Sequence, residues 1–123
     1  MTKTNRQVLV LGARGMLGTD LVRMLDQKGI EARLLDLPEF DITNAQQLKA
    51  AVASAETSIN CAAYTNVDKA ESEPDLAYRV NAESVGQLGR FAAEAGANVV
   101  HISTDFVFDG KSDRPYIETD STN

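Results

Sequence analysis

The fold of this chain is decided by one stretch near its N-terminus, Val8-Leu9-Val10-Leu11-Gly12-Ala13-Arg14-Gly15-Met16-Leu17-Gly18. An apolar run leads into three glycines at three-residue spacing, and an amphipathic pattern follows, which predicts a strand, a tight turn and a helix. Gly12 permits the sharp turn, Gly15 leaves room for an anion beside the backbone, and Gly18 allows the helix to pack closely on the strand. The stretch therefore predicts a cradle for a phosphate at the amino end of a helix.

The alternation of strand and helix continues along the rest of the chain. The sequence predicts strands over 7–11, 32–35, 57–61 and 98–103, a further short strand over 40–42, and helices over 16–28, over 75–95 and after a cap at Thr43 or Asn44. It also predicts a polar loop or short helix over 66–73, close packing at the helical glycines 86 and 89, and a polar, turn-rich tail over 109–123. Such alternation is typical of a parallel sheet with helices on both faces. We therefore expect an α/β fold of the Rossmann type, a doubly wound parallel sheet in one domain over residues 1–123.

The composition suits a single soluble domain. The chain has 123 residues, 43% of them hydrophobic, and a formal net charge of −6. No apolar run approaches the roughly 20 residues that cross a bilayer, and residues 1–6 lack the apolar core of a signal peptide. The acidic balance argues against a nucleic-acid or membrane partner. Because the chain has one cysteine and no Cys/His cluster with metal-ligand spacing, we expect a cytoplasmic protein without a disulfide or a metal.

Two lone residues have simple structural interpretations. Cys61 ends an apolar run, so we expect a buried small hydrophobic residue rather than a nucleophile. His101 is the only histidine and lies in the apolar run 99–102. We expect it in the core or at a sheet edge rather than as a catalytic base.

Two acids follow the second predicted strand. Asp36 lies about 20 residues beyond the glycine turn, where a carboxylate accepts hydrogen bonds from ribose hydroxyls and repels a 2′-phosphate. This favours NAD over NADP, but Arg14 inside the turn weakens the preference because a cation can neutralise a 2′-phosphate. Asp36 can also be a solvated turn residue. Asp41 lies near the expected adenine site and can equally cap the next helix.

Two further segments place small or polar side chains directly after a predicted strand. The run Asn60–Thr65 has small residues past which a flat ligand can lie, although tight strand–helix packing explains them as well. Ser103, Thr104 and Asp105 put two hydroxyls and a carboxylate after the last strand, where a hydroxyl can bond a substrate carbonyl. Alone, these three residues would only indicate a turn. Ligands of parallel sheets bind beyond the carboxyl ends of the strands, so we expect these segments to share one site.

Four segments together resemble a single family. They are the glycine turn, the run 60–71, the triplet Val80-Asn81-Ala82 and the run 102–110, and residues 115–120 support them. In this order and spacing they resemble the N-terminal part of the dTDP-4-dehydrorhamnose reductases, which are extended short-chain dehydrogenases/reductases. The resemblance implies reduction of the 4-keto group of a dTDP-linked 6-deoxysugar in dTDP-L-rhamnose biosynthesis. NADH or NADPH would be the cofactor and a nucleotide sugar the substrate.

The resemblance also implies roles for individual residues. The cofactor's pyrophosphate would lie along Gly12, Gly15, Met16, Leu17 and Gly18. Its adenosine would meet Asp36, Asp41 and Ile42, and its nicotinamide half would lie by Ala62, Ala63 and Tyr64. Thr104 would be the catalytic hydroxyl, Ser103 and Asp105 would support it or the sugar, and Asn81 would have a structural role.

The family's catalytic Tyr-x-x-x-Lys pair is absent from this chain. The three tyrosines are followed four positions later by Asp68, Ala82 and Asp120. In the family the pair comes shortly after the segment that matches 117–123, and a C-terminal substrate lobe follows. We therefore expect a Rossmann-type sheet truncated before that lobe, which supplies the cofactor-binding part and is inactive alone. Phe106 and Cys61 are milder departures, at positions where tyrosine and alanine are usual.

Three expectations accompany this interpretation. One alternative is a non-catalytic, dinucleotide-binding regulatory subunit. Another is a nucleotide-sugar epimerase or dehydratase. We also expect self-association, because the last strand would expose an unpaired edge.

Overall fold

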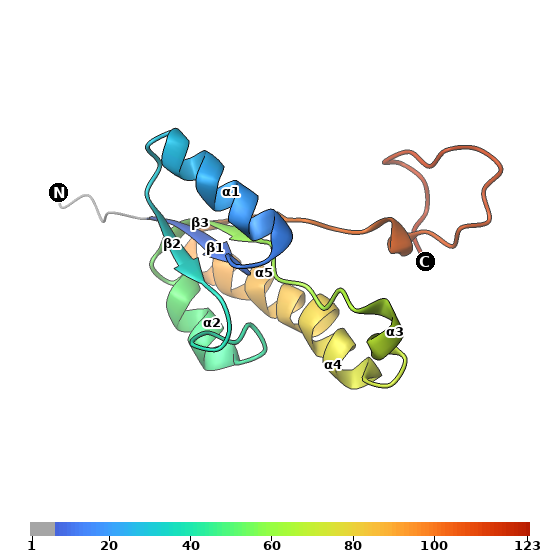
Figure 1. Cartoon of the computed structure of the whole chain (residues 1–123), viewed down its shortest axis with the longest axis horizontal. Helices are drawn as coiled ribbons and strands as arrows, with labels where there is room; N and C mark the ends of the chain where they lie inside the picture. Colours follow the sequence, from blue (N-terminus) through green and yellow to red (C-terminus); the bar gives the residue numbers. More distant parts are fainter. Residues whose placement is uncertain (1–6) are drawn as a thin grey trace.

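The computed structural model describes residues 7–123 and contains one four-stranded sheet (Figure 1). The strands lie in the order β2–β1–β3–β4, and all three pairings are parallel. In the chain order, β2 is added on one side of β1, and β3 is then added on the other side. The strand order therefore reverses between β1 and β3, at the carboxyl ends of these two strands. The strands are β1 (Gln7–Leu11), β2 (Ala32–Leu35), β3 (Ala55–Asn60) and β4 (Asn98–His101).

Helices cover both faces of the sheet, which confirms the predicted doubly wound α/β fold. Figure 1 shows α1 on one face and α2 and α5 on the other. The helices are α1 (Met16–Gln27), α2 (Ala45–Val52), α3 (Val67–Ala70), α4 (Pro74–Tyr78) and α5 (Ser84–Ala95). Among the described residues, no helix is long and apolar enough to cross a membrane. The signal-peptide prediction concerns residues 1–6, which lie outside the described part of the chain.

The two faces of the sheet carry hydrophobic cores of unequal size. Leu9 and Leu11 join the larger core, which includes Leu48 of α2 and Leu88 of α5. Val10 points to the opposite face and joins a smaller core beneath α1, because side chains alternate along a strand. The α2–α5 face therefore contains most of the buried apolar side chains in the described residues.

The strand β4 forms an exposed edge of the sheet. Val100 shares the α1 face with Val10 through the register of β1, β3 and β4, but it is 46% exposed, and Ile102 just beyond is 50% exposed. An exposed edge with apolar side chains can pair with another chain. Self-association through this edge stays a prediction.

The predicted short strand over 40–42 is wrong. Phe40 and Ile42 are both buried in the larger core, and this alternation imitates a strand. Their backbone instead forms turns: the Phe40 N–H donates to the Asp36 carbonyl at 3.0 Å, and the Asn44 N–H donates to the Asp41 carbonyl at 2.9 Å. Asn44 then caps α2 by accepting from two backbone N–H groups, which decides between the two predicted caps.

The long helix predicted over 75–95 is present but is not a uniform α-helix. It begins at Pro74, and the π-helical segment Arg79–Glu83 separates α4 from α5. The prediction that Gly86 and Gly89 permit close packing is wrong, because a Cβ at either position would meet no atom within 4 Å. The predicted polar segment before Pro74 contains the short helix α3, capped by the Asn66 side chain.

Beyond β4 the chain leaves the sheet. The C-terminal segment 103–123 extends away from the rest of the molecule and turns back on itself (Figure 1). Apart from a 3-10 turn over Asp105–Val107, it has no helix or strand, as the polar, turn-rich composition predicts.

Candidate cofactor site

The turn between β1 and α1 is fixed by its neighbours on both sides. The Gly12 N–H donates to the Leu35 carbonyl of β2 at 2.9 Å, and Gly12 has a φ of +72°. A Cβ at this position would lie 2.5 Å from the Ala62 nitrogen, in the loop after β3. Gly12 is therefore required both by the backbone conformation and by close approach of the β3 loop.

Gly18 is required by packing of the helix on the turn. A Cβ at this position would collide with the Gly12 carbonyl oxygen and would lie 2.9 Å from two backbone atoms of Ala13. Gly18 is buried accordingly. These contacts confirm the close approach of helix and strand that the sequence predicts.

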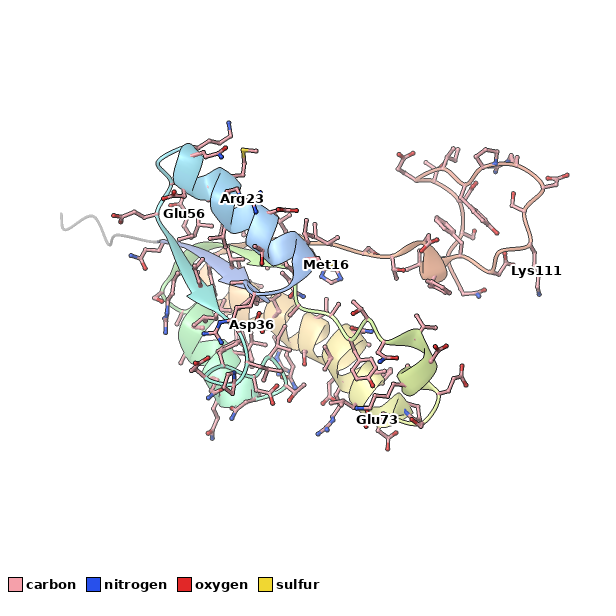
Figure 2. The ribbon with its side chains drawn as sticks, viewed as in Figure 1. Met16, Arg23, Asp36, Glu56, Glu73 and Lys111 are labelled. Atoms are coloured by element: carbon pink, nitrogen blue, oxygen red, sulfur yellow. The ribbon has the colours of Figure 1, made fainter. Side chains whose placement is uncertain are left out.

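Gly15 has a different environment. It is exposed and is the N-cap of α1, and a Cβ there would meet only the Gly12 carbonyl oxygen, at an ordinary contact distance of 3.5 Å. The described protein atoms therefore leave open space beside Gly15. No side chain caps this end of α1, and its first turn has no acidic residue, so the N–H groups and positive end of the helix remain available to an anion. Met16 and Leu17 begin the helix and are exposed, and Figure 2 shows Met16 at this end.

Asp36 lies just beyond the end of β2 (Figure 2) and binds the glycine turn directly. Its Oδ2 atom accepts from the Arg14 backbone N–H at 2.7 Å, and its Oδ1 atom accepts from the Leu37 N–H at 2.8 Å. The structure thus brings Asp36 and the glycine turn together, as the motif spacing predicts. The carboxylate is half-buried rather than a free turn residue.

The Arg14 side chain is bound to the turn after β2. Its guanidinium donates to the Leu37 carbonyl at 2.6 Å and to the Glu39 carboxylate at 2.9 Å. The hydrogen bond with Glu39 raises the pKa of the Arg14 guanidinium, and the same bond lowers the pKa of the Glu39 carboxyl. Arg14 therefore stays cationic and Glu39 stays anionic near neutral pH.

These groups line an open pocket of about 680 Å³ beside the carboxyl end of β2. Its polar residues are Arg14, Arg33, Asp36, Glu39 and Gln47, and its apolar wall comes from β2, Phe40 and α2. A pocket of this size, with an apolar wall and a few polar groups, can hold a nucleoside. The pocket lies where the motif spacing predicts the adenosine half of a dinucleotide.

The two residues predicted near adenine are partly engaged elsewhere. Asp41 accepts from the Thr43 N–H at 2.9 Å and from the Thr43 hydroxyl at 2.7 Å, in the turn before α2. The Ile42 side chain is buried in the larger core. Neither residue lines the pocket, so any adenine contact from them would involve backbone atoms or a rearranged Asp41.

The loop Ala62–Tyr64 is held from two sides. Asn60, which is 1% exposed, accepts from the Ala62 N–H at 3.0 Å. Asn81 in the π-helical segment accepts from the Tyr64 N–H at 2.8 Å and donates to the Tyr64 carbonyl at 3.0 Å. Asn81 therefore has a structural role, as expected, because it binds both backbone groups of Tyr64. Since Gly12 contacts Ala62, this loop lies directly beside the glycine turn.

The hydroxyl of Tyr64 donates to the Glu73 carboxylate at 2.7 Å. This hydrogen bond raises the pKa of Tyr64 to about 12 and lowers the pKa of Glu73. A tyrosine with so high a pKa is a poor proton donor or acceptor near neutral pH. Tyr64 therefore suits a positioning role better than an acid–base role.

The three polar residues after β4 are all exposed. The Thr104 hydroxyl accepts from the Phe106 N–H at 3.2 Å and donates to the Asp105 carboxylate at 3.3 Å. No hydrogen bond or ion pair is found between Ser103, Thr104 or Asp105 and the glycine turn in the described part of the chain. The structure therefore joins Asp36 to the glycine turn, but among the described residues it shows no hydrogen bond between Thr104 and that turn.

The lone histidine and cysteine agree with a structural interpretation. His101 is exposed on the edge strand β4, so the sheet-edge alternative holds and the core alternative is wrong; its Nδ1 accepts from the Asn60 amide at 3.2 Å. Cys61 is half-buried against the smaller core, and burial raises the pKa of its thiol. Within residues 7–123, no group of three or more His, Cys, Asp or Glu side chains is placed to hold a metal ion.

Two residues that organise the site escaped sequence reasoning as candidates. Asn60 lies in the run 60–65, which the sequence singles out for its small residues, but that pattern does not identify its amide as a site group. A buried amide at the end of β3 nevertheless needs a hydrogen-bond partner. Glu39 had no signal in the sequence, because its partner Arg14 is 25 residues away and only the turn after β2 brings the two side chains together.

The parallel sheet, the strand order and the glycine turn define a Rossmann-type α/β domain. The chain belongs to the RmlD substrate binding domain family, which matches residues 6–123. A dTDP-4-dehydrorhamnose reductase of Streptomyces griseus is 43% identical over 116 residues, covering 93% of this chain and 38% of that protein.

Solved structures agree with this assignment. The crystal structure of a dTDP-4-dehydrorhamnose reductase from Clostridium acetobutylicum is 39% identical, with a TM-score of 0.89 over 95% of this chain and 42% of the other. The dTDP-4-dehydrorhamnose reductase of Bacillus anthracis, solved in complex with NADP, is 37% identical with a TM-score of 0.86, over 95% and 42% of the respective chains. This chain thus spans about 40% of the length of the relatives it matches.

Proposed function

We propose that this chain binds a nicotinamide dinucleotide across the carboxyl ends of β1, β2 and β3. The pyrophosphate would lie against the N–H groups at the start of α1, beside Gly15, and the adenosine in the pocket by Asp36. Gly12 and Gly18 have protein atoms pressed against them, whereas Gly15 faces open space. This one observation carries the proposal, because Gly15 alone among the three glycines of the turn has no packing reason to lack a side chain.

We further propose that the chain is the cofactor-binding part of an enzyme that reduces the 4-keto group of a dTDP-linked 6-deoxysugar. The family membership and the similarity to dTDP-4-dehydrorhamnose reductases support this substrate class. The bound nicotinamide would supply the hydride. The Thr104 hydroxyl would hydrogen-bond the keto oxygen of the substrate, with Ser103 and Asp105 orienting that hydroxyl or the sugar.

The proton for the new hydroxyl has no donor among the residues of this site. None of the three tyrosines is followed four residues later by a lysine, and the high pKa of Tyr64 makes it unsuited to proton transfer. The 123-residue chain would therefore bind cofactor without turnover. Sustained NAD(P)H-dependent reduction of a dTDP-4-keto-6-deoxysugar by this chain alone would overturn this statement.

A binding measurement tests the cofactor site. Gly15→Val places a side chain where the pyrophosphate would lie and should weaken NADH binding, followed by its fluorescence, at least about tenfold, or ~1.4 kcal/mol. Gly89→Ala is the matched control, since that glycine lies in α5 and a Cβ there would meet nothing within 4 Å. Equal NADH affinity in wild-type and Gly15→Val protein would contradict the proposed site. Binding without turnover, together with a stable complex with another protein, would instead favour a regulatory subunit.

A further inference from the structure

Arg14 is the only cationic residue of the glycine turn that lines the pocket, and its side chain is bound by the turn after β2. The Arg14 guanidinium donates to the Leu37 carbonyl at 2.6 Å and to the Glu39 carboxylate at 2.9 Å. Both partners follow β2, although Arg14 itself lies between β1 and α1. The side chain therefore links the two loops that border the pocket.

Two carboxylates surround this position. Asp36 accepts the backbone N–H of Arg14, and Glu39 accepts its guanidinium. Both acids line the pocket together with Arg14. A hydroxyl at this position can donate to a carboxylate, whereas a phosphate accepts only and is repelled by each negative charge.

The ion pair is open to competition by a ligand. The side chains of Arg14 and Glu39 are 63% and 68% exposed, respectively. An exposed ion pair contributes little to stability, so a phosphate dianion could compete with Glu39 for the Arg14 guanidinium. The negative charge of Glu39 opposes this competition, because it repels the phosphate. Arg33, the other cation lining the pocket, has no ion pair within the described residues.

We propose that Glu39 is a specificity-determining residue of the adenosine pocket. By occupying Arg14 and adding a second negative charge beside Asp36, Glu39 makes the site prefer a ribose 2′-hydroxyl to a 2′-phosphate. The chain then prefers NAD(H) to NADP(H), even though its glycine turn carries an arginine that could hold a phosphate. This inference rests on the proposed cofactor site.

Calorimetric titration of the chain with NAD⁺ and NADP⁺ tests the inference. Wild-type protein should bind NAD⁺ more tightly than NADP⁺. Glu39→Gln keeps the side-chain size but removes the charge, and it should raise NADP⁺ affinity at least about tenfold while changing NAD⁺ affinity less than about threefold. Glu56→Gln is the matched control, because it removes the same charge at the opposite, amino end of the sheet (Figure 2) and should change neither affinity.

Double variants identify the cation that gains the phosphate. Arg14→Leu combined with Glu39→Gln should lose the gain in NADP⁺ affinity, whereas Arg33→Leu combined with Glu39→Gln should keep it. Loss of the gain only with Arg33→Leu would overturn the role of Arg14. Equal changes in both affinities on Glu39→Gln, or wild-type preference for NADP⁺, would overturn the role of Glu39 while leaving the cofactor site intact. Failure of every variant to bind either dinucleotide would overturn the proposed function, and this inference with it.

Discussion

The glycine turn and the C-terminal segment 103–123 are both built from turns, but they are held in opposite ways. The turn is fixed by partners distant in sequence: Leu35 and Asp36 at the carboxyl end of β2, and Ala62 after β3. In the C-terminal segment the contacts that hold the turns join residues of the segment itself, such as the Asn123 N–H and the Val107 carbonyl at 2.8 Å. Phe108 and Tyr116 stack with ring centroids 4.3 Å apart, and Arg114 binds the Asp120 carboxylate at 2.7 Å.

The glycine turn with Asp36 and the residues after β4 therefore differ in how they are supported. Contacts with β2 and with the loop after β3 fix Gly12 and Asp36, two of the residues expected to bind the cofactor. The residues expected to meet the substrate lie at the start of a segment that contacts little besides itself. Asp36 and the glycine turn are thus joined in the structure without a ligand, whereas Thr104, within residues 7–123, has hydrogen bonds only inside its own segment.

The largest contrast should come from two glycines with the same backbone conformation. Gly12 and Gly110 have φ values of +72° and +71°, but a Cβ at Gly12 would strike the β3 loop, and one at Gly110 would meet nothing within 4 Å. Gly12→Ala should lower the free energy of unfolding by about 3 kcal/mol or more. Gly110→Ala should cost only ~1 kcal/mol of local strain. Urea denaturation measures both, and similar losses would mean that the turn is not more tightly constrained than the tail.

A second contrast concerns the buried amide that connects β3 to its loop. Asn60→Ala removes the acceptor for the Ala62 N–H and the donor to His101. It should destabilise the fold by about 1–3 kcal/mol, because the half-buried Ala62 N–H loses its acceptor. It should also weaken NADH binding, since Ala62 lies against Gly12. Asn98→Ala, at an exposed position in β4, is a control that should change neither. An unaltered urea midpoint in Asn60→Ala would show that the loop is held by other contacts.

The Tyr64–Glu73 hydrogen bond should respond to pH in a defined direction. Glu73→Gln removes the charge that favours neutral Tyr64, so the pKa of Tyr64 should fall from about 12 toward its ordinary value of 10. Absorbance at the tyrosinate band follows this titration, and Tyr64→Phe identifies the step. A titration unchanged by Glu73→Gln would remove Glu73 as the cause.

The pKa shifts of Tyr64 and Glu73 predict the pH range over which their hydrogen bond stabilises the fold. The pKa of Tyr64 is raised in the folded protein, so its contribution is full below pH 10 and disappears as the pH rises through about 12. The pKa of Glu73 is lowered, so its contribution is full above its ordinary value of 4.5 and disappears as the pH falls below that value. The pair therefore stabilises the loop across the neutral range.

The smallest effect should come from a matching hydroxyl in the tail. The Tyr116 hydroxyl donates to Asp109 at 2.9 Å, much as Tyr64 does to Glu73. Tyr116→Phe keeps the stack on Phe108 and should change the free energy of unfolding by less than about 0.5 kcal/mol. Limited proteolysis should nevertheless cut the segment 109–123 faster. A large shift in the urea midpoint would show that the tail is coupled to the sheet.

Several features could be predicted from the sequence because they depend on local pattern. The strand–turn–helix order around Gly12, the helix ends and the choice of Thr43 or Asn44 as the cap of α2 follow from residues within a few positions of one another. The place of Asp36 at the carboxyl end of β2 followed as well, since a parallel sheet gathers its strand ends at one edge. The short strand over 40–42 could not be excluded locally, because Phe40 and Ile42 alternate as in a strand while their burial comes from α2 and α5.

The amino-acid sequence by itself determined the Rossmann-type sheet and the need for glycine at the first turn, because hydrophobic period and backbone freedom are properties of short segments. Only the tertiary structure decided that Arg14 meets Glu39 and that Asn81 holds the Tyr64 loop. These two pairings join residues 25 and 17 positions apart in the chain. No local preference fixes such distances; packing of the helices on the sheet does.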